Sequence, residues 1–295
     1  MRRPTILITG SNGQLGFELA RLCTPAGEIV AADRAALDLA DPDAIVAAVR
    51  GAKPDLVINA GAYTAVDLAE KEVPQATAIN ARAPGILAEE VKRIGALLIH
   101  YSTDYVFDGA RTTPYPEDAP TAPLNVYGAT KLAGEQAIAA IGGRALVLRT
   151  SWVYGLRGRN FLQTIRKLAA ERDELRIVAD QIGVPNWSRT LAEATARIVG
   201  AEGAALTDRQ GVYHLSGTGA ASWHDFARAI VGDVKKPRII AIATAEYPLP
   251  ARRPPYGVLD TARFESAFGF GLPDWRDVLA RCLASPAEFE DRQNA

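Results

Sequence analysis

The chain has 295 residues, of which 48% are hydrophobic and 23% are charged, and its formal net charge is −1 at pH 7. This composition is typical of a compact globular enzyme, and the balanced charge argues against a nucleic-acid or membrane-surface partner. The two cysteines and the short apolar run Ile6–Ile8 give no disulfide framework, signal peptide or membrane span, so we expect a cytoplasmic protein.

Through about residue 150, short apolar runs alternate with longer helical patterns. Each run has the near-continuous hydrophobicity that a parallel strand needs when helices cover both faces of its sheet. The expected strands are Thr5–Thr9, Ile29–Ala32, Leu56–Asn59, Leu97–Tyr101 and Ala145–Arg149. The pattern predicts an α/β fold in which residues 1–150 form a Rossmann-type, doubly wound parallel sheet that binds NAD(P).

After Trp152 the alternation becomes irregular. Helical periodicity covers Asn160–Arg172, Arg189–Gly200 and Ser222–Gly232, and short strands are expected near Arg176–Val178 and Gly211–Leu215. We therefore predict that residues 151–295 form mainly a smaller, mixed α/β substrate lobe, with some segments returning to the Rossmann sheet.

A glycine-rich turn follows the first strand at Gly10, Gly13 and Gly16, just before a helical pattern. Such a turn lets a pyrophosphate approach the backbone and directs the helix N-terminus at it. The spacing is G-x-x-G-x-x-G rather than G-x-G-x-x-G, so close helix packing alone would also explain it. An acid at Asp33, about 20 residues later, favours the dinucleotide interpretation.

Two adjacent side chains after the second strand leave the choice of cofactor open. Asp33 suits the adenosine ribose hydroxyls and Arg34 suits a 2′-phosphate, so both NADH and NADPH remain candidates. A plain surface turn is the alternative for Asp33. Asp38 and Leu39 follow as candidates for the adenine pocket, although capping of a helix would also account for them. The small residues in Asn59–Thr64 predict either a close backbone approach to the cofactor or a simple helix entry.

The candidate catalytic residues are Thr103, Tyr127 and Lys131. Tyr127 and Lys131 are four residues apart and share a helix face, so the ammonium is expected beside the phenol, where it would lower the tyrosine pKa. Thr103 ends the fourth strand and is expected to donate a hydrogen bond to a carbonyl oxygen. The ordered set of glycine turn, Ser-Thr and Tyr-x-x-x-Lys predicts a dehydrogenase, whereas the three histidines have no metal-ligand spacing and no metal is expected.

The sequence resembles the dTDP-4-dehydrorhamnose reductases, an extended short-chain dehydrogenase group, over nearly its full length. The stretches that carry the resemblance are Ser102-Thr103-Asp104-Tyr105-Val106-Phe107-Asp108-Gly109, Pro123 to Glu135 around Tyr127-Gly128-Ala129-Thr130-Lys131, Arg149-Thr150-Ser151-Trp152-Val153-Tyr154, and Pro250-Ala251-Arg252-Arg253-Pro254.

This resemblance implies reduction of the C4 ketone of dTDP-4-dehydro-6-deoxy-L-mannose with NADH or NADPH, by a monomer or homodimer. Thr103, Tyr127 and Lys131 then match catalytic positions, and Asp104 and Trp152 match the substrate pocket, together with Thr103. The positions that match cofactor contacts are Gly13, Gln14, Leu15, Asp33, Asp38, Leu39, Ala62, Tyr63, Thr64 and Tyr101. Arg252 and Arg253 are expected to bind the nucleotide diphosphate, unless they are only a solvated charged loop.

One departure from the family pattern and two groups of related proteins leave other functions open. Some relatives are described as magnesium-linked dimers with acidic residues on the first helix and on a later helix. Glu18 fits the first of these positions, but Arg189 stands at the second, so a metal-bridged dimer is not expected. The regulatory β subunit of methionine adenosyltransferase resembles the same family without being a reductase. A nucleotide-sugar epimerase, or another nucleotide-sugar 4-ketoreductase, would keep the same Thr103, Tyr127 and Lys131.

Overall fold

The computed structural model describes residues 2–202, 209–233 and 236–285, so the last part of the predicted second lobe lies outside the described residues. Its centre is a six-stranded sheet in the order β10-β5-β4-β3-β1-β2, with every neighbouring pair parallel. The strands are β1 (Thr5–Thr9), β2 (Glu28–Ala32), β3 (Leu56–Asn59), β4 (Leu97–Thr103), β5 (Ala145–Thr150) and β10 (Gly211–His214). The predicted doubly wound α/β class is confirmed.

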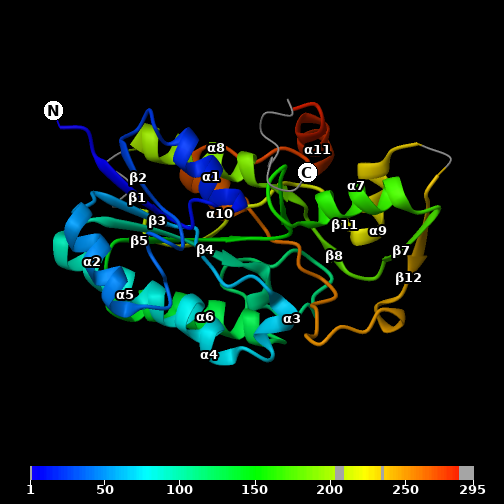
Figure 1. The fold of residues 1–295 in the computed structure, drawn as a ribbon, viewed down its shortest axis with the longest axis horizontal. Coiled ribbons are helices and arrows are strands. Elements are labelled where there is room, and N and C mark those ends of the chain that lie inside the picture. Colours follow the sequence, from blue (N-terminus) through cyan, green and yellow to red (C-terminus); the bar gives the residue numbers. More distant parts are fainter. Residues whose placement is uncertain (1, 203–208, 234–235, 286–295) are drawn as a thin grey trace.

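Helices cover both faces of this sheet (Figure 1). On one face, Leu7, Val57 and Leu98 pack in the core that α2, α5 and α6 cover. On the other face, Ile6, Ile58 and Ile99 pack in the core below α1, α8 and α10. These helices are α1 (Gln14–Leu22), α2 (Pro42–Ala52), α5 (Ala83–Ile94), α6 (Val126–Ile141), α8 (Ser188–Glu202) and α10 (Ala262–Phe268). Burial on both faces explains why the strands are continuously apolar.

A smaller lobe lies beside the carboxyl ends of the strands (Figure 1). Its own core is built around Trp187, Phe226 and Trp275. The lobe contains β6 (Val153–Tyr154), α7 (Phe161–Glu171), β7 (Glu174–Val178), β8 (Ile182–Gly183), β9 (Asn186–Trp187), β11 (Ala221–Ser222), α9 (Trp223–Val231), β12 (Arg238–Ile242) and α11 (Trp275–Leu283). Strand β10, from the second half of the chain, instead pairs with β5 at the edge of the large sheet.

Short helical segments follow strands β3, β4 and β12. After β3 come α3 (Val66–Ala69), α4 (Val73–Thr77) and the π-helical turn η1 (Ala78–Arg82), which leads directly into α5. The 3₁₀ turn η2 (Asp104–Val106) follows β4, and the 3₁₀ turn η4 (Thr244–Glu246) follows β12. Within the described ranges, no helix is both long and apolar enough to cross a bilayer.

Candidate active site

The turn between β1 and α1 places backbone against backbone. Gly10 has a φ of +67°, and a Cβ on it would lie 2.7 Å from the Cα of Gly61, so the ends of β1 and β3 touch. A Cβ on Gly16 would lie 2.1 Å from the Gly10 carbonyl oxygen. Side chains at these positions would break the turn, which explains the glycine spacing.

The first turn of α1 is open toward this cradle. Its N-cap is Gly13, which has no side chain to cap the helix amides. The Gln14 side-chain oxygen is buried and has no hydrogen-bond partner among the described residues. Uncapped amides at a helix N-terminus suit a phosphate, and a buried acceptor without a donor suits a polar ligand. The residues present therefore fit a dinucleotide cofactor at this edge.

Asp33 lies directly after β2 and is held by three hydrogen bonds. Its Oδ2 accepts from Asn12 Nδ2 at 2.7 Å, and its Oδ1 accepts from the backbone amides of Ala35 and Ala36. Asp33 therefore connects the glycine turn to the turn after β2, and Arg34 beside it is exposed. Both structural and ligand-binding roles are compatible with this geometry.

Two further predicted contacts, Asp38 and Leu39, belong to the same region. The Asp38 carboxylate accepts from the Ala40 amide at 2.9 Å, within its own turn. The Leu39 side chain lies under Gly61, where a Cβ would approach it to 2.6 Å. Leu39 therefore supports the backbone at the end of β3.

Asn80 connects the segment after β3 to α6, and the sequence analysis missed it. Its side chain accepts from the Tyr63 amide at 2.8 Å and donates to the Tyr63 carbonyl at 3.0 Å. It also donates to Thr130 Oγ1 at 3.3 Å. Asn80 is 1% exposed. It therefore fixes the Ala62–Thr64 backbone relative to the helix that bears Tyr127; an asparagine within a helical stretch was the only signal of this in the sequence.

Tyr127 lies in the first turn of α6, which Asn125 caps through a hydrogen bond from the Gly128 amide at 2.8 Å. Burial raises the pKa of Tyr127 to about 12, the nearby Asp104 charge raises it as well, and a hydrogen bond with the Thr103 side chain opposes the shift. Thr103 and Tyr127 therefore meet as expected. The direction of the pKa shift is opposite to the one expected from Lys131, because burial dominates.

Lys131 is 2% exposed and points into the sheet rather than along its helix. Its Nζ donates to the Tyr101 carbonyl oxygen at 2.6 Å and lies 3.3 Å from His100 Nε2. Burial lowers the Lys131 pKa to about 8, against the opposing charge of Glu135. The Tyr101 side chain instead reaches Thr195 on α8, so only its backbone faces this site.

Glu135 lies one turn beyond Lys131 and forms a buried ion pair. Its carboxylate binds the Arg149 guanidinium at 2.7, 3.0 and 3.2 Å and accepts from the Ser102 hydroxyl. Both side chains of the pair are 5% exposed. The pair therefore anchors α6 on β4 and β5 and sets the depth at which Tyr127 and Lys131 lie.

Asp104 and Trp152 lie on the side of the smaller lobe. Burial raises the pKa of Asp104 to about 7, and its Oδ1 accepts from the Thr103 hydroxyl at 3.0 Å. Trp152 has a φ of +43°, which is unusual for a bulky residue. Its indole stacks on Trp223 with ring centroids 3.5 Å apart, over Gly183, where a Cβ would lie 2.5 Å away. The lobe therefore holds Trp152 in one strained position.

Arg252 and Arg253 lie in the loop that leads from η4 to α10. The two arginines bind different partners. Arg253 binds both carboxylate oxygens of Asp67 on α3, at 2.8 and 2.7 Å, and also the Ala251 carbonyl. Arg252 is exposed, and its carbonyl accepts from Asn125 at 2.8 Å. Arg253 therefore joins the two lobes, and both Arg252 and Arg253 line a cleft.

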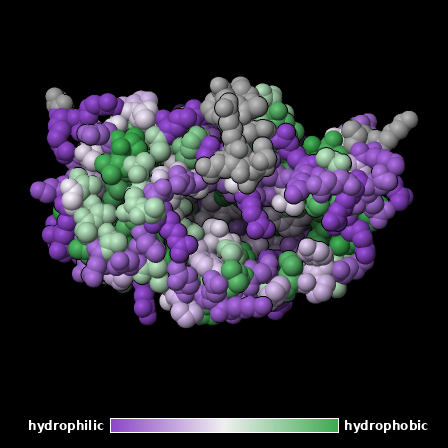
Figure 2. Space-filling model, in the orientation of Figure 1, coloured by the Kyte–Doolittle hydropathy of each residue, from purple (hydrophilic) through white to green (hydrophobic). Residues whose placement is uncertain are grey.

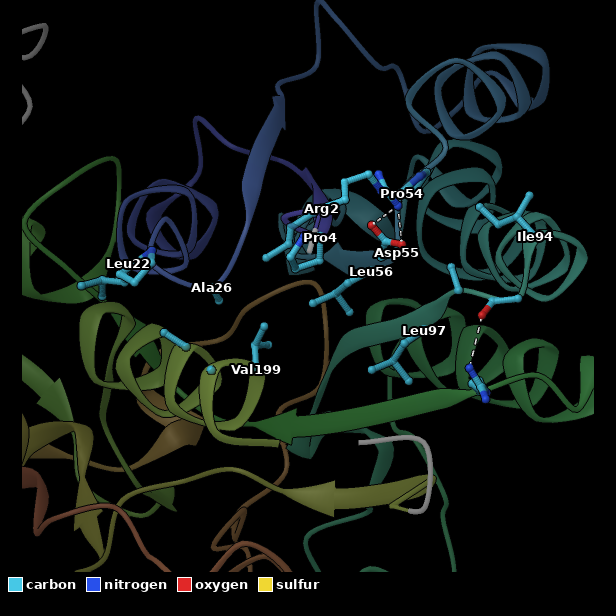
Figure 3. Close-up of a pocket in the computed structure, with 17 residues that line it drawn as sticks. Arg2, Pro4, Leu22, Ala26, Pro54, Asp55, Leu56, Ile94, Leu97 and Val199 are labelled. Atoms are coloured by element: carbon cyan, nitrogen blue, oxygen red, sulfur yellow. Dashed lines mark hydrogen bonds and ion pairs between the residues drawn. The ribbon is translucent and has the colours of Figure 1, made fainter. Parts of the chain in front are cut away.

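A cleft of about 1100 Å³ runs from Tyr105 past Trp223 to Arg252. The surface is hollowed between the two lobes in Figure 2. A second cavity, of about 930 Å³, lies at the opposite, amino edge of the sheet. Figure 3 shows it lined by apolar residues such as Leu22, Leu56 and Val199, with Arg2 bound to Asp55. Of the predicted site residues, Arg252 and Arg253 line the first cleft, and none lines the second cavity.

Glu18, the acid on the first helix for which the resemblance raised a metal-binding role, forms two ion pairs. Glu18 binds Arg189 at 3.2 Å and Arg21 at 2.7 Å. In the part of the chain that the structure describes, no three His, Cys, Asp or Glu side chains gather as metal ligands would.

Known proteins resemble this chain over almost its whole length. The family model for the RmlD substrate binding domain matches residues 4–287. The dTDP-4-dehydrorhamnose reductase of Burkholderia thailandensis is 47% identical, covering 94% of this chain and 97% of its own, and that of Escherichia coli is 41% identical, covering 94% and 96%. The crystal structure of the Bacillus anthracis enzyme with NADP superposes with a TM-score of 0.89 at 35% identity, covering 96% and 99%.

Proposed function

Because the chain belongs to the family described as the RmlD substrate binding domain, we propose that it reduces the C4 ketone of dTDP-4-dehydrorhamnose to dTDP-L-rhamnose with NADPH or NADH. The observation that supports this best is the proximity of Thr103, at the end of β4, to Tyr127, which lies in the first turn of α6 one helical turn from buried Lys131. These groups lie at the carboxyl edge of the sheet, where ligands bind in open α/β folds.

The glycine cradle and the open N-terminus of α1 suit the cofactor's pyrophosphate. Gln14 and Leu15 begin that helix, and Asp33 and Arg34 face the same edge. The bound dihydronicotinamide supplies the hydride. In this assignment residues 1–150 hold the cofactor and residues 151–295 mainly hold the sugar nucleotide, while β10 completes the sheet.

Tyr127 is the proton donor in this mechanism. With its pKa raised to about 12, the phenol stays protonated at neutral pH and is ready to give its proton to the C4 oxygen. The Thr103 hydroxyl, which donates to Asp104 in this structure, turns to donate to the same oxygen as negative charge develops there. The raised pKa therefore suits the reductive direction, in which the tyrosine begins protonated.

Lys131 restores the proton on Tyr127. An ammonium with a pKa of about 8 is a stronger acid than a phenol with a pKa of about 12, which makes Lys131, one helical turn away, the acid best suited to return a proton to the phenolate. The transfer leaves a neutral amine, and solvent returns the proton after product leaves.

The substrate occupies the cleft between the lobes. The exposed Arg252 guanidinium suits the diphosphate, whereas Arg253 is committed to Asp67 and sets the loop position. Asp104 lies beside Thr103, and Trp152, stacked on the cleft residue Trp223, is assigned to the sugar. The enzyme acts in the cytoplasm, as a monomer or homodimer; its buried, unpaired Cys23 and Cys282 fit a reducing compartment.

Turnover of a small panel of dTDP- and UDP-linked 4-ketosugars with each cofactor tests the proposal. Tyr127→Phe should lower kcat by about 10²- to 10⁴-fold and leave the NADPH Kd unchanged. The matched control is Tyr154→Phe, since Tyr154 has a buried hydroxyl without a partner among the described residues. Cofactor binding without turnover of any ketosugar would favour a regulatory subunit, and cofactor retained through gel filtration with epimerised product would favour an epimerase.

A further inference from the structure

Three buried polar residues form a row across the sheet where β1 and β3 end. Thr9 on β1 is in register with Asn59 on β3, and Asn59 is in register with His100 on β4. The row two residues earlier consists of Leu7, Val57 and Leu98, as a buried parallel sheet normally requires. Thr9 and Asn59 are 1% exposed and His100 is fully buried. Burying three polar side chains costs stability unless each is hydrogen-bonded, so the row needs a reason.

The hydrogen bonds of this row all run in one direction. The Gly61 amide donates to Thr9 Oγ1 at 3.2 Å, and the Thr9 hydroxyl donates to Asn59 Oδ1 at 2.6 Å. Asn59 Nδ2 lies 2.9 Å from His100 Nδ1. With the Asn59 amide in this orientation its nitrogen donates, so His100 Nδ1 accepts and the imidazole proton is on Nε2. That Nε2 lies 3.3 Å from Lys131 Nζ.

The opposite orientation of the Asn59 amide would satisfy the row less well. Asn59 would then donate to Thr9 Oγ1, which already accepts from Gly61, and the Thr9 proton would lose its acceptor. Thr9 therefore selects the orientation of Asn59, and Asn59 selects the tautomer of His100.

We propose that Thr9, Asn59 and His100 are positioning residues that present the His100 Nε2 proton to Lys131 and so stabilise its neutral amine. The proposal rests on the proposed function, in which Lys131 gives a proton to the Tyr127 phenolate. One N–H bond of the ammonium breaks and the phenol O–H bond forms. The lone pair left on Nζ then accepts from His100, while the Tyr101 carbonyl keeps another Nζ proton.

Other charges around Lys131 do not replace this effect. Glu135, on the same helix, favours the ammonium, but its carboxylate is already bound by Arg149 from β5. Tyr127 lies near Asp104, the first residue of η2. Both side chains have raised pKa values, so both are uncharged below about pH 7. Toward β4, His100 is the titratable group that contacts Nζ, and burial holds its pKa well below the usual value. A neutral His100 therefore persists throughout the working range.

The imidazole tautomer tests the structural half directly, without turnover. The chain has three histidines, so ¹⁵N-histidine NMR of the free and NADPH-bound protein is simple to assign with a His100→Gln variant. The expected spectrum has a protonated Nε2 and an unprotonated Nδ1 for His100 at neutral pH. A protonated Nδ1 would overturn the proposal whether or not the protein reduces ketosugars.

The pH dependence of turnover tests the functional half. Thr9→Val removes the hydroxyl that fixes Asn59, so the amide is free to turn and His100 Nε2 becomes an acceptor for the ammonium. The alkaline limb of the kcat profile should then move up by about half a pH unit or more, the size expected of one neutral hydrogen bond. Thr9→Ser keeps the hydroxyl and should restore the wild-type limb.

Thr5→Val is the matched control. Thr5 lies on the same strand and face as Thr9 and is also buried, and among the side chains of the described residues its hydroxyl bonds only to Arg2. If the alkaline limb of the kcat profile does not move in Thr9→Val, or moves equally in Thr5→Val, then Thr9, Asn59 and His100 do not control the protonation of Lys131. If Thr9→Val does not fold, the kcat profile of His100→Gln tests the proposal instead. Its alkaline limb is expected to move in the same direction. A wild-type protein inactive on every 4-ketosugar would contradict the proposed function, while the NMR result would still judge the row.

Discussion

Replacing Asp33 by asparagine should shift the cofactor preference toward NADPH. The carboxylate carries its charge at the turn where Arg34 is exposed, and its Oδ1 holds the amides of Ala35 and Ala36. Asparagine keeps an oxygen for these two amides, so the turn after β2 remains, while the charge and the hydrogen bond from Asn12 are removed. An alanine would lose both the turn and the charge and would confuse the two effects.

The magnitude follows from one charge near a 2′-phosphate. Two unit charges a few Å apart at a protein surface interact by about 1–4 kcal/mol before screening, which corresponds to about 5-fold or more in selectivity. The assay is the NADPH-to-NADH ratio of kcat/KM for wild type, Asp33→Asn and Arg34→Ala at low and high salt. Arg34→Ala should move the ratio the other way, and both shifts should shrink as salt rises.

The control for this experiment is Asp41→Asn, because Asp41 caps α2 through the amides of Asp43 and Ala44. It makes the same chemical change at an acid outside the turn. Equal cofactor ratios in wild type, Asp33→Asn and Arg34→Ala would show that this turn does not contact the adenosine ribose, and Asp33 would be only a structural residue.

Three other substitutions probe the site and its support. Glu135→Gln leaves the buried Arg149 charge unbalanced and should lower the free energy of unfolding by about 3–5 kcal/mol in urea denaturation; a loss below about 1 kcal/mol would refute the anchoring role. Folding raises the pKa of Asp104 from 3.8 to about 7, so the folded protein binds this proton more tightly than the unfolded chain does. The stability that this proton contributes is therefore lost as the pH rises from about 4 to about 7. Asp104→Asn should therefore stabilise the protein at pH 8 by up to about 4 kcal/mol relative to its effect near pH 4, and equal effects at both pH values would contradict this. Gly183→Ala would push a methyl group to 2.5 Å from the Trp152 indole, and should raise the KM for the sugar nucleotide about tenfold without changing the NADPH Kd; an unchanged KM would exclude Trp152 from the substrate pocket.

Local patterns predicted most of the large sheet. The runs Thr5–Thr9 and Leu56–Asn59 have the same bounds in the structure, because buried parallel strands leave an unbroken apolar signal. Helix boundaries were also readable where caps exist: Asn160 accepts from the Gln163 amide just before α7. The family resemblance is confirmed as well, since it depended on contiguous residues.

Contacts between distant segments were not predictable. Arg253 binds Asp67 across 186 residues, and no periodicity marks such a pair. Helical spacing put Lys131 on the face of Tyr127, but it could not indicate that β4 would supply the acceptor at the Tyr101 carbonyl. The register of Asn59 and His100 likewise exists only once the strands are ordered in space.

The most direct test of the proposed reduction follows the hydride itself. NADPH deuterated at the transferable position of the nicotinamide is incubated with the protein and dTDP-4-dehydrorhamnose, and the product is examined by NMR. The account predicts dTDP-L-rhamnose with one deuterium at C4 for each cofactor oxidised. Product without deuterium at C4, or oxidation of the cofactor without a reduced sugar, would contradict it.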